Sequence, residues 1–202
     1  MPGLMIKWVY MEIKFLNNST IFIKGKKESI LIDPTEKEIV ENKNASRTLI
    51  YTNGDFNDTS LVTDQKIIIR GGGEYEIGGV EIMGINGEDG NTVYRIVIDS
   101  FVLVILGRIK QELTPKRIER IDSTDILVAP TSIGGSCSFK LVQGWAKKWG
   151  ANYLVPEIDD EIFLKKFLDD ADEEGLEKVD SLKLEKQEDL PDGLEIKLLK
   201  NN

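Results

Sequence analysis

The chain has 202 residues, 41% of them hydrophobic and 30% charged, which is the composition of an ordinary globular protein. Its formal net charge of −9 disfavours general binding to nucleic acid or to an anionic membrane, and no apolar run approaches the roughly 18 residues that a transmembrane helix needs. The absence of histidine and the single Cys137 exclude an internal disulfide, a multi-cysteine zinc site and catalysis by a histidine base.

Residues 1–10 are predicted to be an N-terminal extension, because a regular strand pattern begins only at Met11. The extension carries Lys7 inside a short apolar run and has no small-residue cleavage site, so a secretory signal peptide is not expected. Residues 11–202 contain no repeat and no long linker, which predicts a single domain. With one cysteine and no signal, the expected compartment is the cytoplasm.

The N-terminal half has the pattern of strands and hairpins. Residues 11–16 alternate and form the first predicted strand, and the apolar runs 21–23 and 30–32 form a hairpin closed by Asp33-Pro34. The next predicted elements are a polar loop or short helix at 35–46, a strand at 47–52, three strands around a glycine-rich turn within 65–85, and a hairpin within 91–107 turned at Asp99-Ser100.

The C-terminal half alternates helices and strands. A helix is expected within 113–121, with Thr114 as its N-cap and Pro115 at its first position. The remaining predicted elements are a strand within 123–130, a helix at 138–150, a strand at 151–156, an amphipathic helix at 159–171 and a final hairpin within 181–199 around Pro191-Asp192-Gly193. Two sheets packed face to face, with helices outside, would bury both halves.

The polar loop TNGDFNDTS follows a predicted buried strand and is the first candidate site. Asn53, Asp55 and Asn57 at alternate positions resemble the start of a calcium loop. The sixth and twelfth positions hold Asp58 and Asp64 rather than glycine and glutamate, which excludes an EF-hand. A magnesium or calcium site on Asp and Asn oxygens and a simple polar turn both remain open.

Residues 70–79, RGGGEYEIGG, contain three consecutive glycines of the kind found in phosphate loops. A phosphate loop runs directly into a helix and supplies a Lys and a Ser or Thr, whereas this stretch continues as strand. A tight bend with close backbone packing is the better interpretation. Without histidine to activate it, Cys137 is expected to be a small, buried or half-buried residue, and Trp145 and Trp149 are expected in the core.

Five segments give the chain its resemblance to a known family: 11–34, 72–85, 91–99, 106–135 and 153–158. In order and length they resemble the strands, turns and helix of bacterial metallo-β-lactamase-fold proteins. The most similar group is the compact one that contains ascorbate-phosphate lactonases and metal-dependent hydrolases. The resemblance runs from Met11 to about Leu199 and implies an α/β fold, a four-layer αβ/βα sandwich.

The central metal motif of that family, Thr-His-x-His-x-Asp-His, falls on residues 52–58 of this chain. Asn53, Asp55 and Asp58 stand where the resemblance places histidines, and Asn57 stands where it places the aspartate. Two zinc ions need about four or five imidazoles and a bridging carboxylate. The resemblance therefore implies a degenerate metal site.

The other ligand positions of the family are also altered. Asn18 stands at the histidine of the opening turn, Arg108 at the bridging aspartate and Gln111 at a nearby histidine. Ile158 stands at the last histidine and offers no lone pair. The histidine between the middle strands falls in a shortened loop near Asn86, Glu88 and Asp89.

The leading prediction is a pseudoenzyme, a hydrolase scaffold without zinc or catalytic residues that acts by binding or assembly. Arg108 cannot be deprotonated and is predicted to pair with Asp55 or Asp58 in the former metal cavity. A protein partner or a second copy of the chain is the expected partner, with no nucleic acid and no membrane.

Two further predictions come from other function classes. The first is a metal-dependent hydrolase of lactonase or phosphoesterase type, in which Asn53, Asp55, Asp58 and Glu88 hold magnesium, manganese or calcium through oxygen. The second is a metal-free binder in which Arg108 holds a small anionic ligand, because arginine favours carboxylate and phosphate groups.

Overall fold

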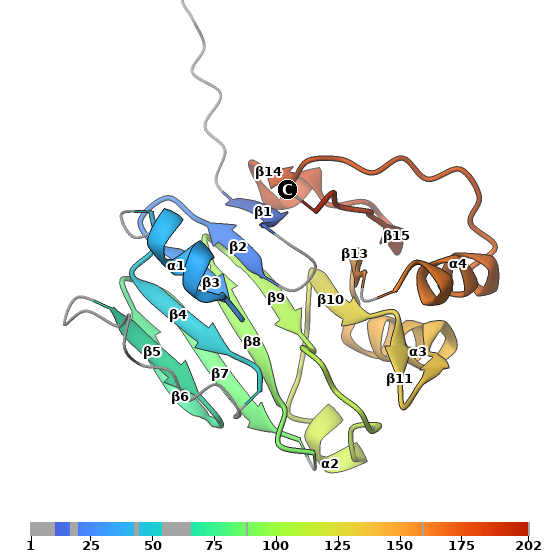
Figure 1. Ribbon diagram of the computed structural model, residues 1–202, viewed down its shortest axis with the longest axis horizontal. Coiled ribbons are helices and arrows are strands. Elements are labelled where there is room, and N and C mark those ends of the chain that lie inside the picture. Colours follow the sequence, from blue (N-terminus) through green and yellow to red (C-terminus); the bar gives the residue numbers. More distant parts are fainter. Residues whose placement is uncertain are drawn as a thin grey trace, which may run out of the picture.

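The computed structural model describes residues 11–16, 20–42, 45–53, 66–87, 89–158 and 160–201. Two β-sheets pack face to face, and helices cover their outer faces (Figure 1). The predicted four-layer αβ/βα sandwich is therefore confirmed. The predicted N-terminal extension, residues 1–10, lies outside the described residues. None of the helices in the described part of the chain is long and apolar enough to span a membrane.

The first sheet has six strands in the order β14-β1-β2-β3-β4-β5. Their bounds are β1 Met11–Phe15, β2 Ile21–Lys24, β3 Ser29–Ile32, β4 Thr48–Tyr51, β5 Ile67–Arg70 and β14 Leu182–Leu184. The strands β3, β4 and β5 run parallel to one another, and the other pairs are antiparallel. Helix α1 (Glu36–Glu41) connects β3 to β4 and packs its Ile39 against Leu31 and Leu49 on the outer face.

The second sheet has seven strands in the order β15-β13-β10-β9-β8-β7-β6. Their bounds are β6 Gly73–Ile77, β7 Val80–Asn86, β8 Thr92–Ile98, β9 Phe101–Ile105, β10 Ile126–Pro130, β13 Tyr153–Glu157 and β15 Glu195–Ile196. The strands from β6 to β9 form an antiparallel meander, whereas β9, β10, β13 and β15 run parallel.

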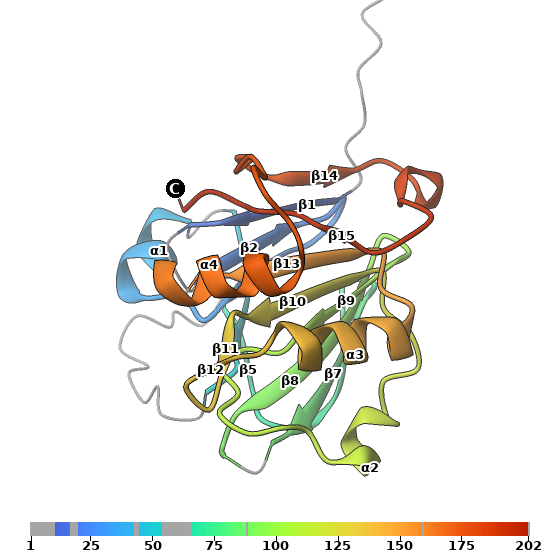
Figure 2. The ribbon, with the colours of Figure 1, turned by 90° about the vertical axis from the view of Figure 1, so that its right-hand side faces the viewer.

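Helices α3 (Phe139–Trp149) and α4 (Glu161–Asp170) cover the outer face of the second sheet (Figure 2). Three smaller elements complete the fold. They are the one-turn helix α2 (Pro115–Ile118), the hairpin of β11 (Ser132–Ile133) and β12 (Ser136–Cys137), and the 3-10 helix η1 (Gln187–Asp189).

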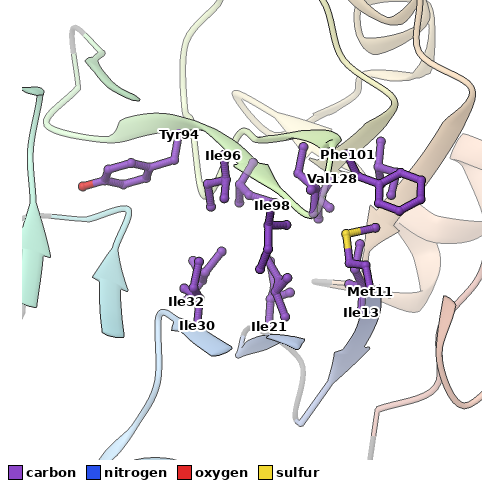
Figure 3. Close-up of a cluster of buried hydrophobic side chains, with 14 of the residues drawn as sticks. Met11, Ile13, Ile21, Ile30, Ile32, Tyr94, Ile96, Ile98, Phe101 and Val128 are labelled. Carbon is purple, nitrogen blue, oxygen red and sulfur yellow. The ribbon is translucent and has the colours of Figure 1, made fainter. Parts of the chain in front are cut away.

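The main core lies between the two sheets. Ile30 and Ile32 of the first sheet face Ile96 and Ile98 of the second, and all four side chains are at most 2% exposed (Figure 3). Burying one such side chain contributes roughly 1.5–3 kcal/mol. The alternation seen in the N-terminal half of the sequence therefore places one face of each strand in this core.

The predicted helix over 138–150 has its apolar stripe on the sheet, as expected. Val142, Trp145, Ala146 and Trp149 are all buried, and the two indole rings stack 6.1 Å apart. Gly150 ends the helix with φ 71°, in the left-handed conformation that glycine adopts without strain. Cys137, one residue before the N-cap of this helix, is half-buried, which confirms the expectation for this thiol.

The predicted hairpin within 181–199 is wrong. The strand β14 pairs with β1 in the first sheet, whereas β15 pairs with β13 in the second sheet. Pro191-Asp192-Gly193 lies between two strands that belong to different layers. Each strand instead covers an edge that would otherwise expose unpaired backbone groups, and local turn chemistry in the sequence does not reveal this choice.

Candidate functional site

The carboxyl ends of β4 and β9 meet at one edge of the sandwich, although the two strands belong to different sheets. The backbone N–H of Thr92 donates to the carbonyl of Thr52 at 2.6 Å. Asn53 and Asn91 form an isolated β-bridge, and the Nδ2 of Asn91 donates to the carbonyl of Leu106 at 2.9 Å. These contacts show that loops from both sheets converge at this edge.

Gly107 allows this close approach. It follows β9 with φ 61°, and a Cβ added to it would lie 2.5 Å from the Cβ of Thr52. A side chain at this position would collide with Thr52 and would also strain the backbone. The small residue in the sequence "LGR" is therefore required by the contact between the two sheets.

The Asp33 carboxylate fixes the start of the loop after β4. Its Oδ1 accepts the backbone N–H of Thr52 at 2.7 Å, and its Oδ2 accepts the Thr52 hydroxyl. Burial raises the pKa of Asp33, while the hydrogen bonds from Thr52 and the positive charge of Arg108 oppose that rise. The carboxylate is thus a structural anchor that lies within electrostatic reach of Arg108.

The described candidate positions differ in their exposure to solvent. Asn53, Arg108 and Gln111 are exposed. Ile158 is only 4% exposed and lies in an apolar cluster with Leu164 and Leu198. The position that the resemblance assigns to the last histidine is therefore part of the hydrophobic core.

Five candidate positions lie outside the described residues: Asn18, Asp55, Asn57, Asp58 and Glu88. The predicted ion pair between Arg108 and Asp55 or Asp58 therefore stays a prediction.

A family model of the beta-lactamase superfamily domain matches residues 12–156. The chain belongs to the metallo-β-lactamase superfamily. A superfamily member from Thermotoga maritima has a TM-score of 0.74 with this chain at 19% identity, covering 94% of this chain and 98% of that one.

Two other solved structures of this fold are similar. The metallo-β-lactamase-fold protein YhfI from Bacillus subtilis has a TM-score of 0.61 at 12% identity and covers 94% of this chain and 96% of its own. A metallo hydrolase from the archaeon Ignicoccus hospitalis has a TM-score of 0.60 at 15% identity and covers 88% of this chain and 99% of its own. At such identities the likeness concerns the fold alone. No curated protein matches the chain.

The side chains of the present chain do not supply the donor atoms that a pair of zinc ions needs. The sequence has no imidazole to offer, and within the described ranges no three His, Cys, Asp or Glu side chains group where they could hold a metal ion. The Asp33 carboxylate is already engaged by Thr52. Zinc in such a site is normally held by imidazole nitrogens, which amide oxygens do not replace.

Two buried polar atoms at the same edge lack a hydrogen-bond partner among the described residues. The Oδ1 of Asn91 and the Oγ1 of Thr131, which follows β10, are buried and find no hydrogen-bond partner within the described part of the chain. Unsatisfied buried oxygens of this kind are uncommon and mark places where a ligand or water is expected.

Sequence reasoning missed Asp33 and Asn91 as residues of this edge. The sequence does carry a signal for Asp33, since Asp-Pro directly follows an apolar strand, but this pattern by itself predicts only the end of a hairpin. Nothing in the local sequence separates Asn91 from the neighbouring polar residues of its loop. Its role comes from the bridge to Asn53, a contact between distant parts of the chain.

Proposed function

We propose that this superfamily member is a pseudoenzyme, which holds no zinc centre and acts by binding rather than by hydrolysis. The observation that carries the proposal is the absence of histidine from all 202 residues. A zinc-bound water is activated by metal charge, and that metal is normally held by imidazole nitrogen. The core position of Ile158 supports the proposal, because restoring a ligand there would place a polar group in an apolar cluster.

The charge of Arg108 supports a binding role. A guanidinium keeps its positive charge at all physiological pH values, so it opposes a divalent cation and favours a carboxylate or phosphate ligand. The charge of Arg108 opposes the rise in the pKa of Asp33, which supports a role for this charge at the edge where the two sheets meet. A small anion bound at Arg108, a protein partner or a second copy of the chain is the proposed ligand.

Elemental analysis of the full chain, purified without chelator, tests the proposal. We expect zinc, iron and manganese far below one ion per chain. After the same preparation is incubated with zinc and desalted, we again expect far less than one zinc ion per chain. One or more tightly bound ions per chain would overturn the pseudoenzyme proposal.

One observation favours a second candidate function, the metal-dependent hydrolase of lactonase or phosphoesterase type. The Oδ1 of Asn91, which has no hydrogen-bond partner among the described residues, is an oxygen of the kind that magnesium, manganese and calcium accept. With Asn53, Asp55, Asp58 and Glu88 it would supply an all-oxygen site. Millimolar magnesium, manganese or calcium would then raise the melting temperature, and an Asp55→Asn, Asp58→Asn double variant would lose that rise. No shift in the wild type would exclude this candidate.

A further inference from the structure

A basic pocket lies between the one-turn helix α2 and the glycine-rich bend that leads into β6. Its volume is about 500 Å³. Lys116, Arg117 and Arg120 line one side, and the backbones of Gly72, Gly73 and Gly84 line the other. In both ribbon views α2 lies at the same end of the molecule as the end of β7 and the start of β8 (Figures 1 and 2).

The glycine side of the pocket is bare backbone for steric reasons. A Cβ on Gly84 would lie 2.5 Å from the carbonyl oxygen of Gly71. Gly73 has φ 155°, and a Cβ there would lie 2.8 Å from the hydroxyl of Tyr75. Because no side chain fits at these points, the wall presents main-chain groups to whatever enters the pocket.

The opposite side concentrates positive charge in a chain whose net charge is −9. Lys116 in α2 and Arg120, which lies just beyond the C-cap Glu119, are four residues apart and carry like charges that repel. The described residues that line the pocket include no carboxylate. The nearby carboxylate of Asp122 is held 3.1 Å from the Nε of Arg95, in an ion pair outside this pocket. An anion that enters would therefore meet the positive charges of Lys116 and Arg120, and no carboxylate among the described residues of the lining.

The remaining lining residues indicate a small polar ligand. Asn86 and Thr114 add an amide and a hydroxyl, and Ile85 is the one large apolar side chain among the described residues of the lining. A volume of about 500 Å³ lies within the roughly 300–1,000 Å³ typical of small-molecule pockets. A nucleic acid would meet the acidic remainder of the surface, which repels it.

We propose that this pocket binds a small, soluble phosphate ester. Lys116 and Arg120 contact the phosphate oxygens, because charge-assisted hydrogen bonds to phosphate are the strong ones that arginine and lysine make. Asn86 and Thr114 bind the neutral, hydroxyl-bearing part. The pocket shares no residue with the Asp33–Thr52–Arg108 edge, so this inference does not depend on the zinc-free proposal.

Calorimetric titration of the full chain at low ionic strength tests the pocket, with glucose 6-phosphate, inorganic phosphate and glucose as probes. We expect glucose 6-phosphate to bind more tightly than inorganic phosphate, glucose not to bind, and the affinity to fall as salt is added. Vesicles of anionic phospholipid form a further arm. Binding to the vesicles without binding to glucose 6-phosphate, or equal binding of glucose and its phosphate, would overturn the proposal.

A pair of matched variants locates the binding. The double variant Lys116→Glu, Arg120→Glu is expected to weaken glucose 6-phosphate binding by at least about tenfold. The control Lys140→Glu, Lys147→Glu makes the same change in net charge on exposed positions of α3 and should bind as the wild type does. Melting curves verify that both variants fold. Equal affinity of the two double variants would contradict the proposed site.

Discussion

The carboxylate of Asp33 and the first residue after β4, Thr52, are joined by two hydrogen bonds. Thr52 donates its backbone N–H at 2.7 Å to one carboxylate oxygen and its hydroxyl to the other. This pair of hydrogen bonds connects the ends of two neighbouring parallel strands, β3 and β4, at the edge where the first sheet contacts the second. The scaffold itself therefore positions the start of the loop after β4.

Replacing Thr52 by valine tests this anchor. The change keeps the shape of the buried side chain and removes the hydroxyl, so the loss reports the hydrogen bond to the carboxylate. We expect Thr52→Val to lower the free energy of unfolding at neutral pH by about 1.5–3 kcal/mol, the range for a hydrogen bond to a charged group. Thr52→Ser keeps the hydroxyl and serves as the control in urea unfolding. Equal losses in both variants would show that the hydrogen bond contributes nothing.

The same variant has a pH dependence whose sign follows from the pKa of Asp33. Burial raises this pKa above its ordinary value of 3.8, so ionisation of Asp33 lowers the free energy of unfolding as pH rises from 3.8 through the folded pKa. The hydrogen bond from the Thr52 hydroxyl opposes that rise, so its loss in Thr52→Val raises the pKa further. The deficit of Thr52→Val should therefore grow as pH rises through the folded pKa of Asp33. If the loss in the free energy of unfolding of Thr52→Val became smaller as pH rose through this range, the prediction would be contradicted.

Gly107 offers a test of the contact between the sheets. Gly107→Ala introduces a Cβ 2.5 Å from the Cβ of Thr52 and places alanine at φ 61°. Gly135→Ala has a similar φ of 79° with no atom within 4 Å, so it shows the backbone cost alone, about 1–2 kcal/mol. We expect Gly107→Ala to lower the free energy of unfolding by clearly more than Gly135→Ala does. If thermal unfolding gave both variants the same loss in the free energy of unfolding, Thr52 would move away from the added methyl group without destabilising the protein.

Much of the fold could be predicted from local pattern. The hairpin of β8 and β9 follows from two apolar runs around Asp99 and Ser100, which adopt φ 50° and 74° in the turn. The stripe of α3 follows from helical spacing, because one element carries the whole signal. The C-terminal strands could not be predicted in this way, since β14 and β15 pair with strands far away in the sequence.

The candidate site is less accessible to sequence reasoning for the same reason. The resemblance identified Arg108 and Ile158 as altered positions, but exposure and burial decide what each one does. Ile158 joins the core through contacts with Leu164 and Leu198, which come from α4 and the C-terminal segment. Gly107 is required by Thr52, which comes from the other sheet. Each of these relationships joins segments that are distant in the chain.

Ile158 gives a prediction for the position of the last family histidine. Ile158→Ala removes a side chain that is 4% exposed, and we expect it to lower the free energy of unfolding by about 2–5 kcal/mol. Ile162→Ala makes the same change at a position that is 67% exposed in α4 and should stay within about 0.5 kcal/mol. Chemical denaturation of both variants compares them. Similar small losses would show that Ile158 is not part of a packed cluster.

The last prediction concerns the cation that stands where the family carries its bridging aspartate. The positive charge of Arg108 favours the ionised form of Asp33, so Arg108→Ala should raise the pKa of Asp33. Arg108→Lys keeps a positive charge and should raise it less. Carboxyl carbon shifts of Asp33, followed by NMR as a function of pH, measure the pKa in all three proteins. If the alanine variant left the pKa of Asp33 unchanged, the charge of Arg108 would not act at this edge, and its proposed roles in opposing a divalent cation and in holding an anion would lose their support.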